Sequence, residues 1–328
     1  MKRFVLLTGV ALIIFGAMFY VVGSLARDRA LVDADRELVG RAQFLANALD
    51  RVLQQRMMQT FTYAALPSLR GFAAADETTR DARTAVARAE LAALASADPN
   101  IHAATIVDAR GIVIMTTDNA MYADWRARFF VGEALRGHLY ASAPAREPNE
   151  IVQFYSAPIL NNAGEIAGAL ALRVDAQEMW NALDAPYGVM LVDEFGVRIM
   201  DRSFTQLFTA LAPLPVDVAA KPLAEKRYGA EITQIRATDL NDLAEVVKRG
   251  GAAQVVYRDA KGRAVHAATR RIATNPWTVI AFESEDDILL PVRQTMYSQI
   301  GLAIASALIT LAMVYIAQSA IAVLGKKW

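Results

Sequence analysis

The most pronounced pattern in the chain is a long apolar run without charges near each end. The first run covers residues 4–26, and the second covers residues 297–324. An α-helix needs about 20 apolar residues to cross the hydrocarbon core of a bilayer, and both runs are long enough. A cleaved signal peptide is the alternative for the first run, but its apolar core is usually only about 7–15 residues long. We therefore expect two transmembrane helices.

Positive residues flank both runs on the side of the chain ends. A Lys-Arg pair at residues 2–3 precedes the first run, and a Lys-Lys pair at residues 326–327 follows the second. Lys and Arg beside a membrane helix favour the cytoplasm. The sequence thus predicts a two-pass protein of the plasma membrane, with both termini cytoplasmic and residues 27–295 extracytoplasmic. The predicted cytoplasmic tail comprises residues 325–328, so we expect output through a longer receptor or a membrane partner.

Small residues form a stripe on the first apolar run. Gly9, Gly16 and Gly23 follow one another at a spacing of seven residues. Such residues let helix backbones approach closely in lipid. The stripe favours a homodimer or a partner within the membrane.

Between the two runs, the first pattern is that of a long helix. Residues 27–65 carry apolar residues at helical spacing, with charged residues over much of the other face. A second helix is predicted over residues 78–95, and Asp98-Pro99-Asn100 ends it with a turn signal. The apolar stripe of the first helix comprises Leu31, Leu38, Leu45, Ala46, Leu49 and Leu53.

The pattern then changes to short apolar runs separated by polar turns, and one such unit occurs twice. Residues 104–115 read ATIVDARGIVIM, and residues 189–200 read VMLVDEFGVRIM. In both, an Asp opens the turn by bonding nearby backbone, and a Gly supplies the positive φ that the turn needs. Each unit therefore predicts a hairpin.

A further hairpin is predicted after each of these units. The first covers residues 151–174 and turns at 161–164, and the second covers 253–283 and turns at 259–262. Two hairpins in the same order, twice, favour a duplicated domain. The expected boundary lies between residues 180 and 181.

Composition narrows the possible chemistry. The 328-residue chain has no Cys, which excludes disulfides and thiolate chemistry, and its formal net charge of zero gives no sign of nucleic-acid binding. His102, His138 and His266 lie far apart in the sequence, so we expect neither a metal nor a cofactor. The chain has no Gly-rich phosphate loop with Lys and no nucleophile elbow, so the sequence does not predict an enzyme.

Together these features resemble the double Cache family, the extracytoplasmic sensor regions of bacterial chemoreceptors, sensor kinases and cyclic-nucleotide enzymes. The resemblance covers residues 27–295 and includes the segment SAPILNNAGEIAGAL at residues 156–170. It implies an α+β fold with two PAS-like Cache modules, each built on an antiparallel sheet, along a long N-terminal helix. The membrane-distal module would lie within residues 27–180 and the membrane-proximal module within 181–293. The family implies a small-molecule pocket, usually in the distal module.

The resemblance also implies the residues of this pocket. Amino-acid-binding members carry an Arg-x-Trp-Tyr run ahead of an Ala-Leu-x-Gly, which matches residues 134–137 here and places Arg128 at the Arg and Phe130 at the Trp. The family's Asp position is held by Arg173, with Asp175 two residues on and on the same strand face. This comparison gives Arg128, Phe130, Arg173 and Asp175 as site residues, and Tyr122, Tyr140 and Tyr155 are candidates for walls and hydroxyl donors of the same pocket.

The expected ligand follows from the charges at these positions. An Arg holds a carboxylate through two parallel hydrogen bonds, and the loss of the Asp that would bind an amine argues against an amino acid. We therefore expect a small anionic ligand such as a mono- or dicarboxylate, with aromatic walls around it. The alternative for Arg128 is a solvated helix start, and the tyrosines could equally be ordinary core residues.

Two functions follow from this interpretation. The first is a membrane-anchored receptor for a small-molecule ligand, which provides the input to chemotaxis-like signal transduction. The second is a structural or accessory subunit of a membrane complex, in which the Cache-like region is a docking module. Copurifying partners would favour the second function, and a ligand-dependent melting shift would favour the first.

Overall fold

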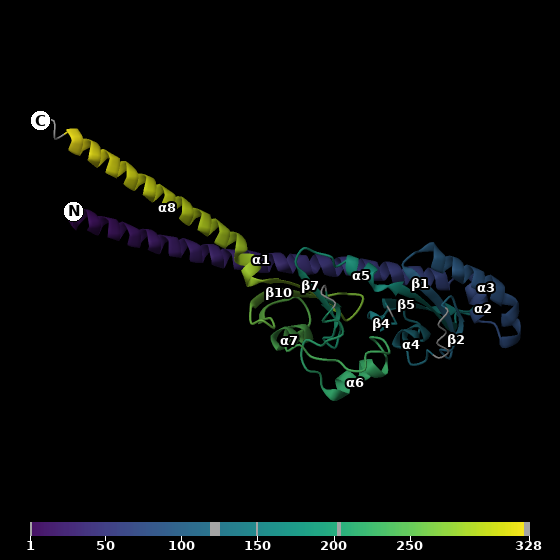
Figure 1. Cartoon of the computed structure of the whole chain (residues 1–328). Helices are drawn as coiled ribbons and strands as arrows, with labels where there is room; N and C mark the ends of the chain where they lie inside the picture. Colours follow the sequence, from purple (N-terminus) through teal and green to yellow (C-terminus); the bar gives the residue numbers. More distant parts are fainter. Residues whose placement is uncertain (1, 119–124, 149, 202–204, 325–328) are drawn as a thin grey trace. The chain divides into compact units, whose positions relative to one another are not determined.

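The computed structural model describes residues 2–118, 125–148, 150–201 and 205–324, with side chains described for 16–310 within these ranges and for 312, 313 and 316 (Figure 1). The chain divides into two compact units. One comprises Met1–Glu37 with Glu283–Trp328, and the other comprises Leu38–Phe282. The predicted tail of residues 325–328 lies outside the described residues.

The terminal unit consists of parts of two long helices, α1 (Lys2–Ala64) and α8 (Glu285–Leu324). The Arg27 guanidinium forms an ion pair with Glu285 at 2.6 Å. A Cβ added at Gly23 would lie 2.7 Å from the Cε of Met296, so the missing side chain leaves space for a residue of α8. Among the described residues, no helix has an apolar stretch of the length that a bilayer crossing needs.

The larger unit begins with the remainder of α1, followed by α2 (Pro67–Ala73) and α3 (Glu77–Ala97). These elements confirm the two helices predicted over residues 27–65 and 78–95. Asp76 caps α3, since its carboxylate accepts a hydrogen bond from the Thr79 N–H at 2.8 Å. The buried side of α1 includes Leu45, Leu49 and Leu53, three of the residues in the predicted stripe.

The distal sheet is antiparallel and, in the part of the chain that the structure describes, has six strands. Its order is β2-β1-β6-β5-β3, with β4 also paired to β5. Helix α4 (Phe129–Leu135) lies between β2 and β3 in the chain, and α5 (Ala176–Asn181) follows β6. The strands are β1 (Ile101–Asp108), β2 (Val113–Thr116), β3 (Tyr140–Ala141), β4 (Ala145–Glu147), β5 (Glu150–Leu160) and β6 (Ile166–Asp175).

The proximal sheet repeats this arrangement with five strands among the described residues, in the order β8-β7-β11-β10-β9. Helices α6 (Val216–Ala224) and α7 (Asn241–Arg249) lie between β8 and β9. The strands are β7 (Gly188–Val192), β8 (Arg198–Asp201), β9 (Ala253–Arg258), β10 (Ala264–Arg271) and β11 (Thr278–Ser284). The two modules thus share one strand order.

Both predicted Asp-x-x-Gly hairpins form. The first joins β1 to β2 and the second joins β7 to β8. The carboxylates of Asp108 and Asp193 each accept hydrogen bonds from the backbone N–H groups two and four residues on. Gly111 and Gly196 have φ angles of +79° and +74°, which explains why glycine occurs at both positions.

The two later turns, by contrast, are not equivalent, and this part of the predicted repeat is wrong. The turn at 161–164 joins β5 to β6, whereas the turn at 259–262 joins β9 to β10. By strand order, β9 and β10 correspond to β3 and β5. The turn sequence indicates a tight reversal between adjacent strands but does not identify which two strands it joins.

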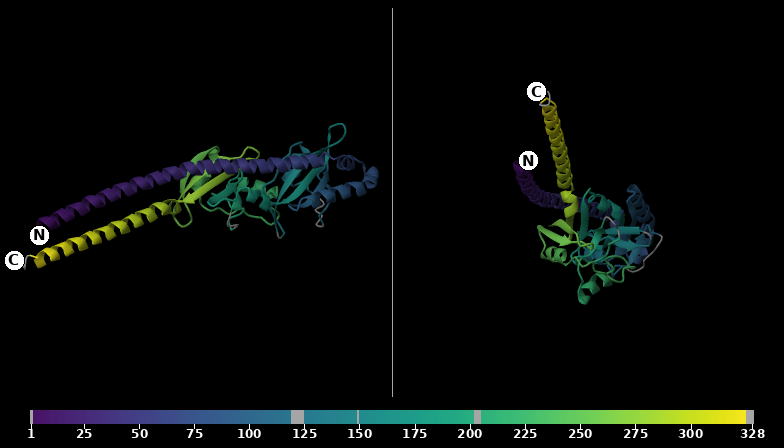
Figure 2. Two further views of the ribbon diagram at one scale, coloured as in Figure 1. Left: turned by 90° about the horizontal axis from the view of Figure 1, so that it is seen from above. Right: turned by 60° about the vertical axis from the view of Figure 1, so that its left-hand side comes forward.

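Each sheet is covered on both faces by apolar core residues. The left view of Figure 2 shows α1 running along both modules. Helix α1 and one face of each sheet form a single core that extends through both modules. A second core covers the other face of the distal sheet, under α4, and a third covers the other face of the proximal sheet, under α7. Representative core residues are Leu49, Ile106 and Leu191 on the α1 side, Val131 and Phe154 under α4, and Leu211 and Leu243 under α7.

Candidate functional site

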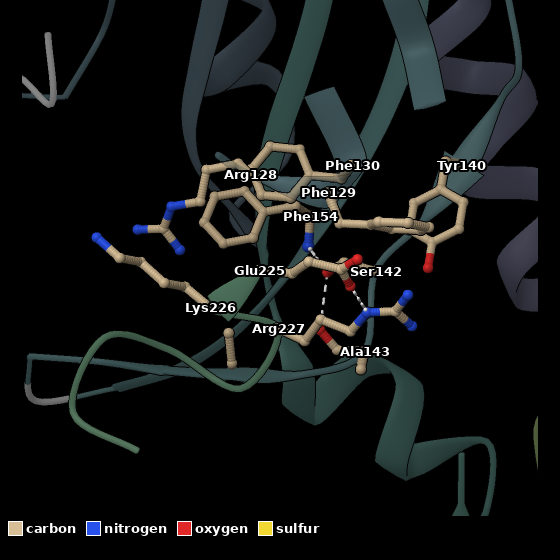
Figure 3. A pocket seen from close by; sticks show the side chains of 11 residues that line it. Arg128, Phe129, Phe130, Tyr140, Ser142, Ala143, Phe154, Glu225, Lys226 and Arg227 are labelled. Atoms are coloured by element: carbon tan, nitrogen blue, oxygen red, sulfur yellow. Dashed lines mark hydrogen bonds and ion pairs between the residues drawn. The ribbon is translucent and has the colours of Figure 1, made fainter. Parts of the chain in front are cut away.

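The candidate site is a small cavity of about 20 Å³, partly open to solvent, on the α4 side of the distal sheet. Residues from α4, β3, β4 and β5 form one side of it, and a segment that follows α6 of the proximal module forms another (Figure 3). Its lining comprises Arg128, Phe129, Phe130, Tyr140, Ser142, Ala143, Ala145, Phe154, Glu225, Lys226 and Arg227.

Arg128 lies at the position immediately before α4, in an extended backbone conformation. The residue is only 8% exposed, and its guanidinium forms an ion pair with Glu147 of β4 at 3.2 Å. The guanidinium carbon also lies 5.9 Å from the centre of the Phe154 ring. The prediction that Arg128 could be a solvated helix start is therefore wrong, since the side chain is buried at the cavity.

Phe130 and Phe154 form the apolar wall beside Arg128, and Trp125 packs against both of them. The rings of Phe130 and Phe154 stack with centroids 4.4 Å apart and an interplanar angle of 7°. Trp125 meets both rings edge-on, at 5.6 and 6.0 Å. The hydroxyl of Ser156 donates to the Phe130 carbonyl at 2.7 Å, which ties α4 to β5. The wall is therefore fixed by packing and by a hydrogen bond, as a preformed binding site requires.

Tyr140 lies on the other side of the cavity, from β3. Its ring meets that of Phe129 edge-on at 5.3 Å. Burial raises the pKa of Tyr140, so its hydroxyl stays neutral and can donate a hydrogen bond at physiological pH.

The proximal segment brings three charged residues to the cavity. The guanidinium of Arg227 pairs with the carboxylates of Glu225 and Glu194. Burial alone would lower the pKa of Arg227, but these two negative charges outweigh it and raise that pKa. Lys226 is exposed and adopts a φ of +50°, which is uncommon for a residue with a side chain.

Two of the predicted residues lie elsewhere in the distal module. Tyr155 is 1% exposed in the core against α1, and its hydroxyl donates to Gln153 at 2.8 Å. Its neighbour Phe154 points to the cavity because successive strand residues face opposite sides. Asp175 caps α5 by accepting a hydrogen bond from the Gln177 N–H. Neither residue lines this cavity, and Tyr122 lies outside the described residues.

Arg173 lies on the cavity side of the distal sheet but does not line the cavity. It pairs directly with Phe154 in the sheet register, so its side chain leaves the sheet on the α4 side. Its guanidinium forms ion pairs with Asp118 at 2.6 Å and Glu150 at 3.4 Å, and it is not part of the lining. The positive charge that the sequence predicted for the pocket is thus neutralised by the carboxylates of Asp118 and Glu150 instead.

Sequence reasoning missed Phe154, Ser142, Glu147 and the segment at 225–227. The alternation of β5 could have placed Phe154 on the ligand face, because Val152, Phe154 and Ser156 share one side of the strand. No local signal identifies residues 225–227, which come close to Arg128 only through the packing of one module on the other. No group of metal-ligating side chains lies together in the described part of the chain.

Two antiparallel sheets of one strand order, packed along a shared helix with a cavity in the first, define a tandem PAS-like sensor module. The Cache domain family model matches residues 24–292, so the chain belongs to the Cache family, in its double form. Domains of this family are extracytoplasmic modules that bind small ligands. No curated protein sequence matches the chain.

Solved structures show the same fold at low sequence identity. The sensor domain of the Vibrio cholerae histidine kinase DctB has a TM-score of 0.61 and 11% identity, and the match covers 77% of this chain and 97% of that one. The ligand-binding domain of the Campylobacter jejuni chemoreceptor Tlp3, in complex with 4-methylisoleucine, has a TM-score of 0.54 and 13% identity over 79% of this chain and 94% of that one. The ligand-binding domain of the Pseudomonas aeruginosa PAO1 chemoreceptor PctB, in complex with L-Arg, has a TM-score of 0.54 and 15% identity. This match covers 78% of this chain and 97% of that one.

Proposed function

We propose that the chain is the input part of a membrane-anchored sensor and that its distal module binds a small carboxylate. The observation that carries this proposal is the buried Arg128 at the edge of a cavity with aromatic walls. Related domains bind small ligands, and the Tlp3 and PctB structures contain amino acids. A carboxylate would accept two parallel hydrogen bonds from the Arg128 guanidinium.

Among the lining residues of the cavity, positive side chains outnumber negative ones. Arg128, Lys226 and Arg227 line it, and Glu225 is the one acid in the described lining. Glu147 neutralises part of Arg128, but a guanidinium has five N–H donors and can contact more than one carboxylate. Phe130 and Tyr140 would pack against the carbon skeleton of the ligand, and the neutral Tyr140 hydroxyl would donate to an oxygen.

The membrane anchors are part of the same proposal and are supported by the sequence. Residues 4–26 and 297–324 are free of charge, and positive residues lie outside each run. Two anchors with this orientation place the Cache modules outside the cytoplasm. A change in the distal module would then reach the cytoplasm through these helices, in a dimer or with a membrane partner.

The proposal is tested by calorimetry on the full chain in detergent, with acetate, succinate, malate, citrate, L-valine and L-arginine as probes. We expect at least one of the four carboxylates without an amine to bind. Arg128→Lys should weaken that binding because an ammonium cannot reproduce the two parallel hydrogen bonds. Arg136→Ala, which changes an exposed Arg at the end of α4, is the control.

A loss of binding at Arg128 must be separated from a loss of folding, and a double variant does this. Arg128→Ala would leave Glu147 buried without its ion-pair partner, which typically costs about 3–5 kcal/mol. The double variant Arg128→Gln with Glu147→Gln removes both charges and should fold while losing the ligand. Binding of a carboxylate with unchanged affinity in this variant would contradict the proposed site. A chain that binds none of the acids and copurifies with a stoichiometric partner would favour the docking role instead.

A further inference from the structure

The segment at 225–229 belongs to the proximal module in sequence but also contacts the distal module. It follows α6 and contributes Glu225, Lys226 and Arg227 to the lining of the distal cavity. Figure 3 shows the side chains of Lys226 and Arg128 extending in the same direction at the cavity. A ligand carboxylate there would meet positive groups from both modules.

Arg227 fixes this segment on α4. Its guanidinium carbon lies 4.0 Å from the ring centre of Phe129, the first residue of α4, and 5.2 Å from that of Phe195. The ion pairs with Glu194 and Glu225 hold the guanidinium between these two rings. Phe195 and Glu194 belong to the turn between β7 and β8, so one side chain joins that turn to the helix over the cavity.

The backbone of the same segment is fixed on β4. The Arg146 N–H donates to the Tyr228 carbonyl at 2.8 Å. Gly229 has a φ of +100°, and a Cβ added there would lie 1.9 Å from the Arg146 carbonyl oxygen. This close approach of two backbones leaves no space for a side chain, and the contact between the modules is therefore tight.

Tyr228 links the segment to Asp193, and this link sets the second hairpin apart from the other Asp-x-x-Gly turns. The second carboxylate oxygen of Asp108 accepts from Arg110, and that of Asp259 accepts from Arg263, both within the same turn. In the β7–β8 turn, the second oxygen of Asp193 instead accepts from the hydroxyl of Tyr228, 35 residues further on. Both Asp193 and Tyr228 are buried, at 2% and 1% exposure.

The β7–β8 hairpin leads on to the C-terminal helix. Strand β7 pairs with β11 along its whole length, from Val192 with Thr278 to Gly188 with Phe282. Strand β11 ends at Ser284, and α8 begins at the next residue. The β7–β8 turn thus adjoins the Thr278 end of β11, the strand that continues into α8.

We propose that residues 225–229 couple the two modules: Lys226 contacts a ligand in the distal cavity, and Arg227 and Tyr228 pass the position of the segment to the β7–β8 turn. The ligand contact rests on the proposed function, whereas the coupling of the modules does not. The positive φ of Lys226 fits a residue held in place for binding, since such conformations concentrate at ligand sites.

The coupling is tested first without ligand, by hydrogen exchange on the full chain. Tyr228→Phe removes the bond to Asp193, and Arg227→Gln removes the charge between Phe129 and Phe195. Both variants should accelerate amide exchange in α4 and in the β7–β8 hairpin together, by about threefold or more, because local stability there depends on the segment. Tyr257→Phe, a buried tyrosine of β9 in the proximal core, is the matched control.

Two results would overturn the coupling. Faster exchange confined to residues 188–229, with α4 unchanged, would mean that the segment stabilises only its own module. If Tyr257→Phe accelerated amide exchange in α4 to the same extent, any destabilisation of the proximal module would reach α4, and the segment would have no specific role. Either result is independent of whether a ligand is found.

The ligand contact is tested with the acid that binds most tightly in calorimetry. Lys226→Glu should weaken it about tenfold or more, the equivalent of about 1.4 kcal/mol, because an attraction becomes a repulsion. Lys221→Glu, on exposed α6 and outside the lining, should leave affinity within about twofold. Affinity unchanged in Lys226→Glu would remove Lys226 from the site, while the exchange result would still decide the coupling. Binding of no acid by the wild-type chain would overturn both the proposed function and the ligand contact.

Discussion

The distal and proximal modules have the same strand order, yet the same Asp-x-x-Gly turn is used differently in each. Asp108 bonds an Arg of its own turn whose side chain is 80% exposed, whereas Asp193 bonds the buried Tyr228 from a distant segment. The sheet faces differ as well: α4 covers a cavity with charged residues, while α7 covers an apolar core around Leu211 and Leu243. Two modules of one strand order can therefore use the same turn for different contacts.

The difference between the two turns also appears in their ionisation. Burial, followed by the negative charge of Glu194, raises the pKa of Asp193 to about 7. Burial alone would raise the pKa of Asp108 too, but hydrogen bonds from Ile112 and Arg110 outweigh it and lower that pKa. One carboxyl is thus stabilised by burial in its neutral form, and the other is stabilised in its charged form.

The largest expected contrast comes from removing each carboxylate. Asp193→Ala should lower the free energy of unfolding by about 3 kcal/mol, because it leaves buried N–H groups and the Tyr228 hydroxyl without an acceptor. Asp108→Ala should cost about 1 kcal/mol, because solvent can reach the groups that it releases. Calorimetric melting of both variants measures this difference. Asp259→Ala, in the turn between β9 and β10, provides a third comparison. Equal losses at Asp108 and Asp193 would contradict a special role for the second turn.

A smaller contrast is expected in the dependence of stability on pH. The folded pKa of Asp193 lies above its ordinary value near 3.9, so its contribution is fully present below about pH 4 and declines as the pH rises to about 7. The folded pKa of Asp108 lies below that value, so its contribution is present above about pH 4 and is lost only in more acidic solution.

The measurement is the difference in melting temperature between wild type and each Asn variant, from pH 4 to pH 8. The melting temperature of Asp193→Asn should rise relative to that of the wild type as the pH rises. The reason is that the amide cannot ionise and keeps an oxygen that accepts the hydrogen bonds of the turn. The difference for Asp108→Asn should stay nearly constant over the same range. A flat profile for Asp193→Asn would show that Asp193 ionises normally in the folded protein.

The smallest expected effects distinguish the two faces of the distal sheet. Tyr155→Phe removes a buried hydrogen bond to Gln153 and should cost about 1 kcal/mol of stability, with ligand affinity unchanged. Tyr140→Phe should change stability by less than about 0.5 kcal/mol but weaken binding, because its hydroxyl is at the cavity. Parallel melting and calorimetry on the two variants check this. Weaker binding in Tyr155→Phe would mean that the ligand lies on the α1 side.

Much of the fold could be predicted because its signals are local. The helix over residues 27–65 and both Asp-x-x-Gly hairpins follow from apolar spacing and from residues that favour particular turns. The mistaken equivalence of the turns at 161–164 and 259–262 arose because a turn signal does not report sheet order. Within the site, Arg128 and Phe130, which came from the family resemblance, and Tyr140, which was expected as an aromatic wall, do line the cavity, whereas Tyr155 and Asp175 do not.

The sequence by itself determined the helices, the hairpins, the duplication and the positions at which glycine or aspartate is required, because each depends on residues close together in the chain. Only the tertiary structure decided which side chains share a cavity and which charges neutralise one another. Arg128 meets Glu147, Arg173 meets Asp118, and Tyr228 meets Asp193 through the packing of elements that are distant in sequence. Burial and pairing are properties of that packing, and no local pattern of residues encodes them.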